Sequence, residues 1–450
     1  DSLIENTTYT INFGDAIRDI TEGNILKNYQ YVFSTGSFID SLELTGSIVA
    51  LPEAEPAENF LVMLYDELSD SVVSKKKPLY FSKTTESGTF NIKHIKKGTF
   101  KIFALEDQNF NYLYDLPNEK IGFAESTISI DTMLKNIEIK VFSEEQSAKL
   151  LSAKAARPGK VVFIFSKPVE KGAITTTNTN QKRATGTWEY SQTMDTVTYW
   201  TSEVYKDTLL FNININAEPE GKKVAMKSLK KDASLTGVLK IKTLLIKQND
   251  TIKSKEKQTW DLYKPVLIIF ENPIKMLSYD SITLLEDSTK LTTKSWAKWQ
   301  DTLLQRKLQI NYDWKPDKKY QLSIAQGAAT DIFGQKNEEL NGEFTTQKKE
   351  DYGSISINVN GEPEQNYFVE IYQKTEKPIN TKQFRGEKTI TFTNLSPGSY
   401  KLRCVRDEND NGKWDTGDYY QKRQPEEIYL FKDPIGVRSN WDLELDWKVR

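Results

Sequence analysis

The chain contains one cysteine and one histidine among its 450 residues. A single cysteine excludes a disulfide bond within the chain, and it excludes zinc modules built from several cysteines. A zinc site with two histidine ligands is excluded in the same way. A Ser-His-Asp triad would have to use His94, which lies where an expected strand runs into a basic turn. We therefore expect His94 to be a solvated edge-strand residue and not a catalytic base.

The sequence also lacks long apolar runs and a dominant charge. The longest apolar runs, such as 60–65 and 266–270, have the length of a strand and are far too short to cross a bilayer. The net charge of −2 gives no whole-chain attraction to nucleic acid or to an anionic membrane. The longest lysine run, at 75–77, is expected to be a solvated loop, because no aromatic and basic module accompanies it.

What the sequence does contain is alternation of apolar and polar residues with period two, interrupted by turn residues. Residues 354–359 and 441–447 are examples. The second stretch places four apolar side chains on one face: Trp441, Leu443, Leu445 and Trp447. Short strands without long crossover helices predict an all-β protein made of antiparallel β-sandwiches, and they argue against a parallel α/β sheet.

One stretch allows two interpretations. The sequence from Ser143 to Gln146 resembles a helix capping box, which favours a helix continuing toward Pro158. Residues 149–155, a turn at 157–159 and an apolar run at 160–165 are instead typical of a hairpin. We favour the hairpin, preceded by at most one helical turn.

Two distant segments share the same pattern of asparagine and aspartate. Each follows a glycine turn and a strand in which apolar and polar residues alternate. The shared positions are Asp107, Asn109, Asn111 and Asp115 in the first copy, and Asp407, Asn409, Asn411 and Asp415 in the second. The single Cys404 has Ala104 at the equivalent place, so we expect a small core residue and not a nucleophile.

A second duplication relates residues 8–35 to residues 319–346, and each copy is followed directly by a module that carries the Asp/Asn loop. Internal duplication of this kind indicates a chain assembled from repeated modules. Residues 1–37 are too few for a complete sandwich, so only its last strands are expected there. The predicted order is the C-terminal part of an Ig-like domain at 1–37, a loop-bearing sandwich at 38–142, Ig-like sandwiches at 143–258 and 259–348, and a second loop-bearing sandwich at 351–450.

The second Asp/Asn loop has the spacing of a calcium-binding loop of EF-hand type. Calcium takes six to eight oxygen ligands, and a glycine at the sixth position allows the loop to turn back. The predicted ligands are Asp407, Asn409, Asn411, the carbonyl of Lys413, Asp415 and Asp418, with Gly412 at the turn. The alternative is a set of Asx turns without metal.

The first copy departs from this calcium-binding pattern. Tyr112 replaces the glycine and Asn118 replaces the last acid. We therefore expect Asx turns without metal in the first copy.

The repeated modules resemble known domain families. Residues 6–17, 31–36 and 319–346 resemble bacterial Ig-like domains of the SbsA type. The modules at 38–142 and 351–450 resemble prealbumin-like sandwiches of the Cna-B or carboxypeptidase-regulatory-like type.

Together with the loop at 407–418 and the sequence at 423–426, this combination resembles Ig-like surface lipoproteins of the Bacteroidota. The resemblance implies a non-catalytic protein anchored by lipid at the outer membrane and exposed on the cell surface. The anchoring N-terminal cysteine of that family is not found in this sequence, which opens at Asp1 as a processed or truncated chain would.

We expect an elongated, non-enzymatic scaffold or accessory subunit that binds other proteins, and no interaction with nucleic acid. By resemblance, the expected partner is an outer-membrane β-barrel complex that assembles or exports proteins. The alternative is a glycan-binding or adhesive protein, which predicts an exposed ring at Trp296 or Trp299. A glycosidase would need two facing carboxylates, and spacing alone cannot identify such a pair among 63 acidic residues.

Overall fold

The computed structural model confirms the all-β prediction. It describes residues 3, 5–14, 16–26, 29–157, 159–178, 186–202, 209–215, 222–226, 239–243, 259–291, 296–373 and 377–449. Within these ranges the chain forms strands β1 to β37, a single-turn helix α1 (Val72–Lys75) and two 3-10 turns, η1 (Tyr279–Ser281) and η2 (Lys349–Asp351). No helix in the described ranges is long and apolar enough to span a membrane.

The N-terminal residues form a two-stranded antiparallel ribbon of β1 (Thr8–Asn12) and β2 (Gln30–Ser34). Tyr9 faces Phe33 across the ribbon, with stacked rings whose centroids lie 5.4 Å apart. The echoed segment contains the same pair, Tyr320 and Phe344, stacked at 5.5 Å. The two segments therefore share strand register as well as sequence.

The first loop-bearing module, 38–142, is a sandwich of two sheets. In one sheet β3 (Leu42–Ala50) pairs with β11 (Leu134–Val141), β4 (Glu55–Pro56) and β7 (Thr89–Ile95). The other sheet comprises β5 (Leu61–Tyr65), β6 (Tyr80–Lys83), β8 (Gly98–Leu105), β9 (Ile121–Phe123) and β10 (Ile128–Ile130). The pairing of β11 with β3 is parallel, so the sandwich is not purely antiparallel.

The first Ig-like sandwich contains the hairpin that the sequence favoured. Strand β12 (Leu150–Arg157) pairs antiparallel with β13 (Lys160–Phe165), and the sheet continues through β16 (Thr196–Trp200) to β15 (Thr187–Tyr190). The facing sheet is β14 (Ile174–Asn178), β17 (Leu209–Ile213) and β18 (Lys222–Met226). Phe163, Tyr199 and Phe211 are fully buried between the two sheets.

The second Ig-like sandwich begins earlier along the chain than predicted. Strand β19 (Ile241–Thr243) pairs with β21 (Val266–Phe270), and Leu239 belongs to the same core. The expected boundary between 258 and 259 therefore falls inside this sandwich. Its first sheet is completed by β26 (Lys307–Ile310) and β25 (Ala297–Trp299).

The second sheet of this sandwich runs in the order β20 (Thr259–Trp260), β29 (Leu340–Thr346), β27 (Lys319–Ile324), β23 (Ile282–Glu286) and β24 (Thr289–Lys290). A short ladder of β22 (Ile274–Leu277) and β28 (Ala329–Asp331) lies beside it. Tyr320 and Phe344 of this sheet are buried in the core.

The second loop-bearing module repeats the architecture of the first. One sheet orders β33 (Glu387–Leu395), β30 (Gly353–Asn360) and β37 (Asp442–Lys448), and β37 runs parallel to β30. The other contains β32 (Asn380–Arg385), β31 (Asn366–Tyr372), β34 (Gly398–Asp407), β35 (Ile428–Leu430) and β36 (Ile435–Val437). Cys404 lies fully buried in its core, and burial raises the pKa of its thiol, as expected for a small core residue.

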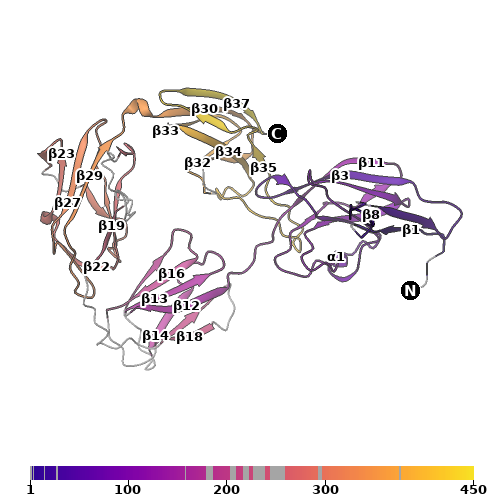
Figure 1. Cartoon of the computed structure of the whole chain (residues 1–450), viewed down its shortest axis with the longest axis horizontal. Helices are drawn as coiled ribbons and strands as arrows, with labels where there is room; N and C mark the ends of the chain where they lie inside the picture. The colour runs from indigo at the N-terminus through magenta and orange to yellow at the C-terminus, as the bar shows by residue number, and fades with distance from the viewer. Residues whose placement is uncertain are drawn as a thin grey trace.

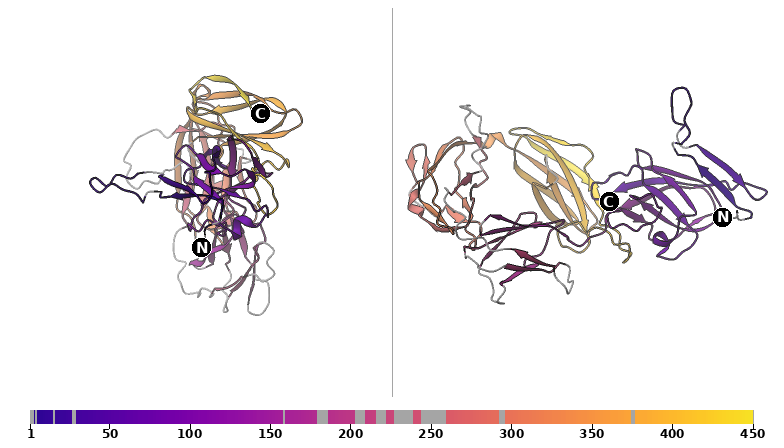
Figure 2. Two further views of the ribbon diagram at one scale, coloured as in Figure 1. Left: turned by 90° about the vertical axis from the view of Figure 1, so that its right-hand side faces the viewer. Right: turned by 60° about the horizontal axis from the view of Figure 1, so that its bottom comes forward.

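The modules do not follow one another in a straight line, as the predicted elongated scaffold would have them. Figures 1 and 2 show that it turns back, so that the yellow second loop-bearing module meets the indigo-to-purple first one. Hydrogen bonds between residues about 300 positions apart, such as Gln424 with Phe123, confirm this contact. Modules that are distant in the sequence therefore become neighbours, and the four sandwiches form a closed path.

Candidate functional site

Both Asp/Asn loops are folded by the same hydrogen bonds. The carboxylate of Asp407 accepts the backbone N–H groups of Asn411 at 3.1 Å and of Gly412 at 2.8 Å. Asp107 accepts the corresponding groups of Asn111 and Tyr112 at 3.2 and 2.9 Å. Asx turns of this kind stabilise the reversal of the chain after the strand, and the second copy retains them unchanged.

The loops close on a second aspartate. Asn409 and Asn411 donate their side-chain amides to one oxygen of Asp415, at 2.5 and 2.7 Å. In the first copy the side-chain amides of Asn109 and Asn111 donate to the two different oxygens of Asp115, at 3.1 and 2.7 Å. Three polar side chains therefore converge at each loop.

A buried glutamate binds backbone N–H groups of each loop, and the pattern of asparagine and aspartate did not predict it. Glu119, with no exposed surface, accepts the backbone N–H groups of Gln108, Asp115 and Leu116. Glu426 accepts those of Glu408 and Asp415 at 2.9 and 3.0 Å. Burial raises the pKa of Glu426, and the two backbone N–H groups oppose this rise.

The two glutamates do not stand at equivalent positions of the two copies, because the connection that follows the loop differs in length. The glutamate follows Asp115 by four residues in the first copy and Asp415 by eleven in the second. The second copy therefore carries a seven-residue longer connection. Matching the two loops position by position cannot align the two acids.

The structure brings together four of the six predicted calcium ligands: Asp407, Asn409, Asn411 and Asp415. The backbone N–H of Lys413 donates to Asn411, which places this residue in the same loop. Asp418 lies on the longer connection, where its carboxylate accepts the N–H of Gln421 and its backbone pairs with Arg423. In the described part of the chain, no group of three His, Cys, Asp or Glu side chains could hold a metal ion. A calcium ion would therefore depend on asparagine, backbone and water oxygens, and it stays a prediction.

The longer connection, residues 415–427, reaches the first loop-bearing module, and we call it the clamp loop. Its Tyr419 is only 6% exposed. The ring lies edge-to-face against three rings of the first module, which we call the aromatic socket: Phe103 at 5.6 Å, Tyr114 at 6.3 Å and Phe123 at 5.3 Å. Edge-to-face packing of this kind adds about 0.5–1.5 kcal/mol per pair beyond area burial.

Polar contacts fix the orientation of the clamp loop. The hydroxyl of Tyr419 donates to the carbonyl of Asp70, and its backbone N–H donates to Glu144 at 2.7 Å. Glu144 also accepts the hydroxyl of Tyr114 at 2.5 Å, so it joins the clamp loop to the socket. The side chain of Gln424 donates to the carbonyl of Phe123 at 2.9 Å.

Close approach and charge complete the clamp. A Cβ on Gly417 would lie 2.4 Å from the ring of Phe142, so only glycine fits there. Lys140 pairs with Glu427 at 3.0 Å. Lys422 pairs with Asp70 at 2.6 Å, and Lys101 binds the same carboxylate.

The apolar run at 60–65 is a local signal that both faces of this sheet are covered. All five residues of β5 are buried, although a strand with one solvated face should alternate. The outward side chains Leu61, Met63 and Tyr65 belong to a second apolar cluster that includes α1, Phe142 and Tyr419. The continuous apolar run at 60–65 therefore indicated a sheet covered on both faces.

Side chains also link the other modules. At the junction of the two Ig-like sandwiches, Arg157 binds Glu271 at 3.2 Å and also Asn272. Arg306 binds Glu189, which accepts the indole N–H of Trp200 at 2.9 Å. Arg157, Lys160 and Arg306 all lie within 5.6 Å of the Trp200 ring centroid, a distance typical of cation–π contacts.

The next junction depends on Tyr352, which lies between the second Ig-like sandwich and the second loop-bearing module. Its hydroxyl contacts Asp261 at 3.0 Å, Gln347 at 2.8 Å and the backbone N–H of Leu262 at 2.7 Å. Its carbonyl accepts the N–H of Asn440 at 2.8 Å. Each of these junctions is therefore held by specific side chains.

The remaining candidate residues have structural positions. His94 lies half-buried in β7 with Nδ1 3.1 Å from the carbonyl oxygen of Asp40, so it is less solvated than expected. Trp296 is 5% exposed and Trp299 is half-buried against Phe270. The exposed ring that a glycan-binding site at 296–299 requires is therefore not present there.

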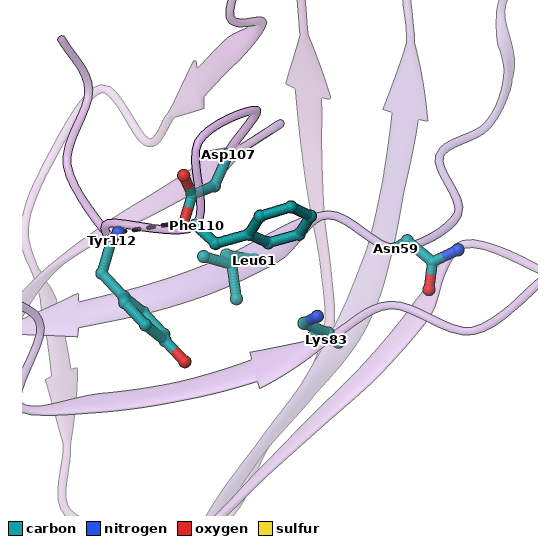
Figure 3. A pocket seen from close by; sticks show the side chains of 6 residues that line it. All are labelled: Asn59, Leu61, Lys83, Asp107, Phe110 and Tyr112. Atoms are coloured by element: carbon teal, nitrogen blue, oxygen red, sulfur yellow. Dashed lines mark hydrogen bonds between the residues drawn. The ribbon is translucent and has the colours of Figure 1, made fainter. Parts of the chain in front are cut away.

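A shallow pocket lies beside the Asp/Asn loop of the first copy. Figure 3 shows its lining residues, with the ring of Phe110 and the end of Lys83 near its mouth. They are Asn59, Leu61, Lys83, Asp107, Phe110 and Tyr112. Its volume is about 40 Å³, which accommodates the end of a side chain.

Comparison with known proteins finds a family model that matches the second loop-bearing module. Residues 343–429, which include β31, β34 and the second Asp/Asn loop, match a family described as "Uncharacterized protein conserved in bacteria (DUF2141)". No curated protein matches the chain.

Among solved structures, the chain is similar to BcpA, the major pilin subunit of Bacillus cereus, with 10% identity, 91% of this chain and 99% of that chain covered, and a TM-score of 0.16. The pilus protein RrgB of Streptococcus pneumoniae gives 8% identity, 92% and 99% coverage and a TM-score of 0.19. A DUF3823 family protein of Parabacteroides merdae is 12% identical, with 42% of this chain and 100% of that chain covered and a TM-score of 0.16. Scores this low carry no argument about function.

Replacement of Tyr419 by alanine should open the clamp. The change removes the ring that fills the aromatic socket and the hydroxyl bonded to Asp70, and truncation of a buried aromatic costs about 3–5 kcal/mol. Small-angle X-ray scattering should show a larger radius of gyration. The matched control is Tyr420→Ala, because Tyr420 is 75% exposed. Identical scattering from the parent chain and Tyr419→Ala would contradict the role of the clamp.

The clamp should weaken in acid. Hydrogen bonds from Lys101 and then from Lys422 lower the pKa of Asp70 from 3.8 to about 2. Lys101 lies in the same module as Asp70, so only the part of the lowering that Lys422 causes stabilises the closed form over the open one. This stabilisation is lost as the pH falls from 3.8 toward 2. Scattering at pH 5 and pH 2.5 should differ less for Asp70→Asn than for the parent chain. An equal acid response in both would show that this ion pair does not control closure.

Calcium can be tested by thermal melting after chelation. If the second loop binds calcium, adding the ion should raise the melting temperature of its module, because a ligand that binds only the folded state stabilises it. Asp415→Ala should remove the increase, whereas Asp115→Ala in the first copy should not. Melting that is independent of both chelator and added calcium would reject the calcium site.

Proposed function

We propose that the chain is a non-catalytic surface scaffold or accessory subunit whose closed set of β-sandwiches presents loops to a partner protein. The observation that carries the proposal is the clamp loop. A connection seven residues longer than its copy joins two modules of the same chain. Holding distant modules at a fixed separation is useful to a protein that must present several surfaces at once.

The other junctions support the same function. The ion pairs around Trp200 and the contacts of Tyr352 restrict rotation between successive sandwiches. Interfaces between domains of one chain are by default mobile, so side-chain links at three junctions indicate selection for a fixed shape. The buried glutamates Glu119 and Glu426 are used to hold loops, which assigns them a structural role.

Location and partner follow from the resemblance to Ig-like surface lipoproteins of the Bacteroidota, with their SbsA-type domains. The proposal places the protein at the outer membrane, exposed on the cell surface and held by a lipid anchor. Its partner would be a β-barrel complex that assembles or exports proteins. The two tryptophans on which the glycan-binding alternative depended are not exposed, because Trp296 is buried and Trp299 packs against Phe270.

Co-purification tests the proposal. The protein should be extracted from native membranes in mild detergent, cross-linked and analysed by mass spectrometry. We expect the same barrel subunits in stoichiometric amounts with the parent chain and with Tyr420→Ala, and a reduced yield with Tyr419→Ala, since the open form no longer holds its surfaces in place. Recovery of the parent chain alone and monomeric would contradict the scaffold function.

A further inference from the structure

The Asp/Asn loop of the first module carries two aromatic residues that its copy does not have. Phe110 and Tyr112 adopt left-handed backbone conformations, with φ of 60° and 66°. The equivalent residues Asp410 and Gly412 have φ of 59° and 69°. Aspartate and glycine are common in this region, whereas bulky residues are not. Asp410 and Gly412 show that this loop can form without aromatic residues at these two positions. The presence of Phe110 and Tyr112 therefore needs an explanation other than folding of the loop.

Both rings lie beside lysines. The Nζ of Lys83 is 5.9 Å from the centroid of Phe110, and the Nζ of Lys77 is 5.7 Å from that of Tyr112. Both lysines are exposed, and neither makes an ion pair with any residue that the structure describes. Phe110 and Tyr112 lie far from these lysines in the sequence and reach them only through the folded loop. We call these four side chains the basic–aromatic strip.

The strip borders the pocket of Figure 3. Leu61 and Tyr112 supply apolar walls, and Lys83 and Asn59 supply polar groups on the other side. Phe110 is 76% exposed, although a ring of this size normally finds cover. Asp107 is the one acid among the lining residues, and its oxygens accept the N–H groups of Asn111 and Tyr112. The charge available to a ligand is therefore positive.

We propose that the basic–aromatic strip binds an acidic polypeptide segment that also carries apolar side chains. This inference rests on the proposed scaffold function and names the chemistry of its partner. Carboxylates of the segment would pair with Lys77 and Lys83, and an apolar side chain would enter the pocket beside Phe110. Backbone strain at a surface loop is expected where function requires it, and here it displays the two rings.

The geometry favours a peptide over a sugar or a nucleic acid. One face of each ring already lies against a lysine, so a base or a sugar ring would have to displace it in order to stack. The pocket accommodates a side-chain end and is too small for a sugar ring. A strip of two lysines also gives few phosphate contacts, and nucleic-acid affinity depends on many.

Fluorescence anisotropy with the purified chain provides the test. The probe is a fluorescein-labelled peptide of repeating Glu-Leu-Glu units, with a Lys-Leu-Lys peptide of equal length as the charge control. We expect saturable binding of the acidic peptide that weakens with salt, and none of the basic one. The combined variant Lys77→Glu and Lys83→Glu should weaken binding at least tenfold, because it replaces attraction by repulsion.

Phe110→Asp gives a second variant that preserves the fold, because aspartate occupies the same conformation in the other copy. It should also weaken peptide binding at least tenfold. Lys388→Glu, an exposed change on β33 of the second module, should leave binding unchanged. Equal binding by the parent chain and by both strip variants would overturn the proposal. So would tighter binding of oligothymidylate or polygalacturonate that the same substitutions abolish.

The outcome is separable from the test of the scaffold function. If native membrane complexes form but the acidic peptide does not bind the strip, this inference fails and the scaffold proposal stands. If the peptide binds the strip but the protein extracted from native membranes is monomeric and has no partners, the scaffold proposal fails. The inference that the strip binds acidic peptides then still stands.

Discussion

The packing of one tyrosine into a socket on another module determines the shape of this molecule. Tyr419 fills a space between Phe103, Tyr114 and Phe123, and its backbone and hydroxyl are bonded to Glu144 and Asp70. The outer face of the β5–β8 sheet is covered by α1, Tyr114 and Phe142 of the same module, and the second module adds Tyr419. Closure of the chain adds the burial of the Tyr419 ring to this cover, and that burial stabilises the closed form.

The two loop-bearing modules show how duplication can divide structural work. In both copies an aspartate, two asparagines and a buried glutamate satisfy the backbone of the same tight loop. Because these bonds hold the loop, the rest of it can change. The first copy carries two exposed or half-exposed rings, Phe110 and Tyr112, and the second carries the clamp loop. A self-sufficient hydrogen-bond network tolerates both the strain and the insertion.

The junctions between successive sandwiches use directional side-chain contacts. A cation–π cluster at Trp200 and a hydroxyl network at Tyr352 give direction as well as attraction, because their partners must be placed within narrow limits. Purely apolar contacts of the same size would resist sliding less. A set of sandwiches joined in this way can hold loops from different modules at fixed positions, which is the property that the proposed scaffold function requires.

The sequence alone determined the fold class, the hairpin at 150–165 and the burial of Cys404, because alternation with period two and turn residues are local signals. It also indicated which residues build the Asp/Asn loops. The start of the second Ig-like sandwich at β19 and the burial of Trp296 depended on contacts between distant segments. The position of Glu426 depended on a connection whose length differs between the two copies. Only the tertiary structure decided that the chain closes on itself, because Tyr419 and its socket are separated by about 300 residues and no local pattern records that they meet.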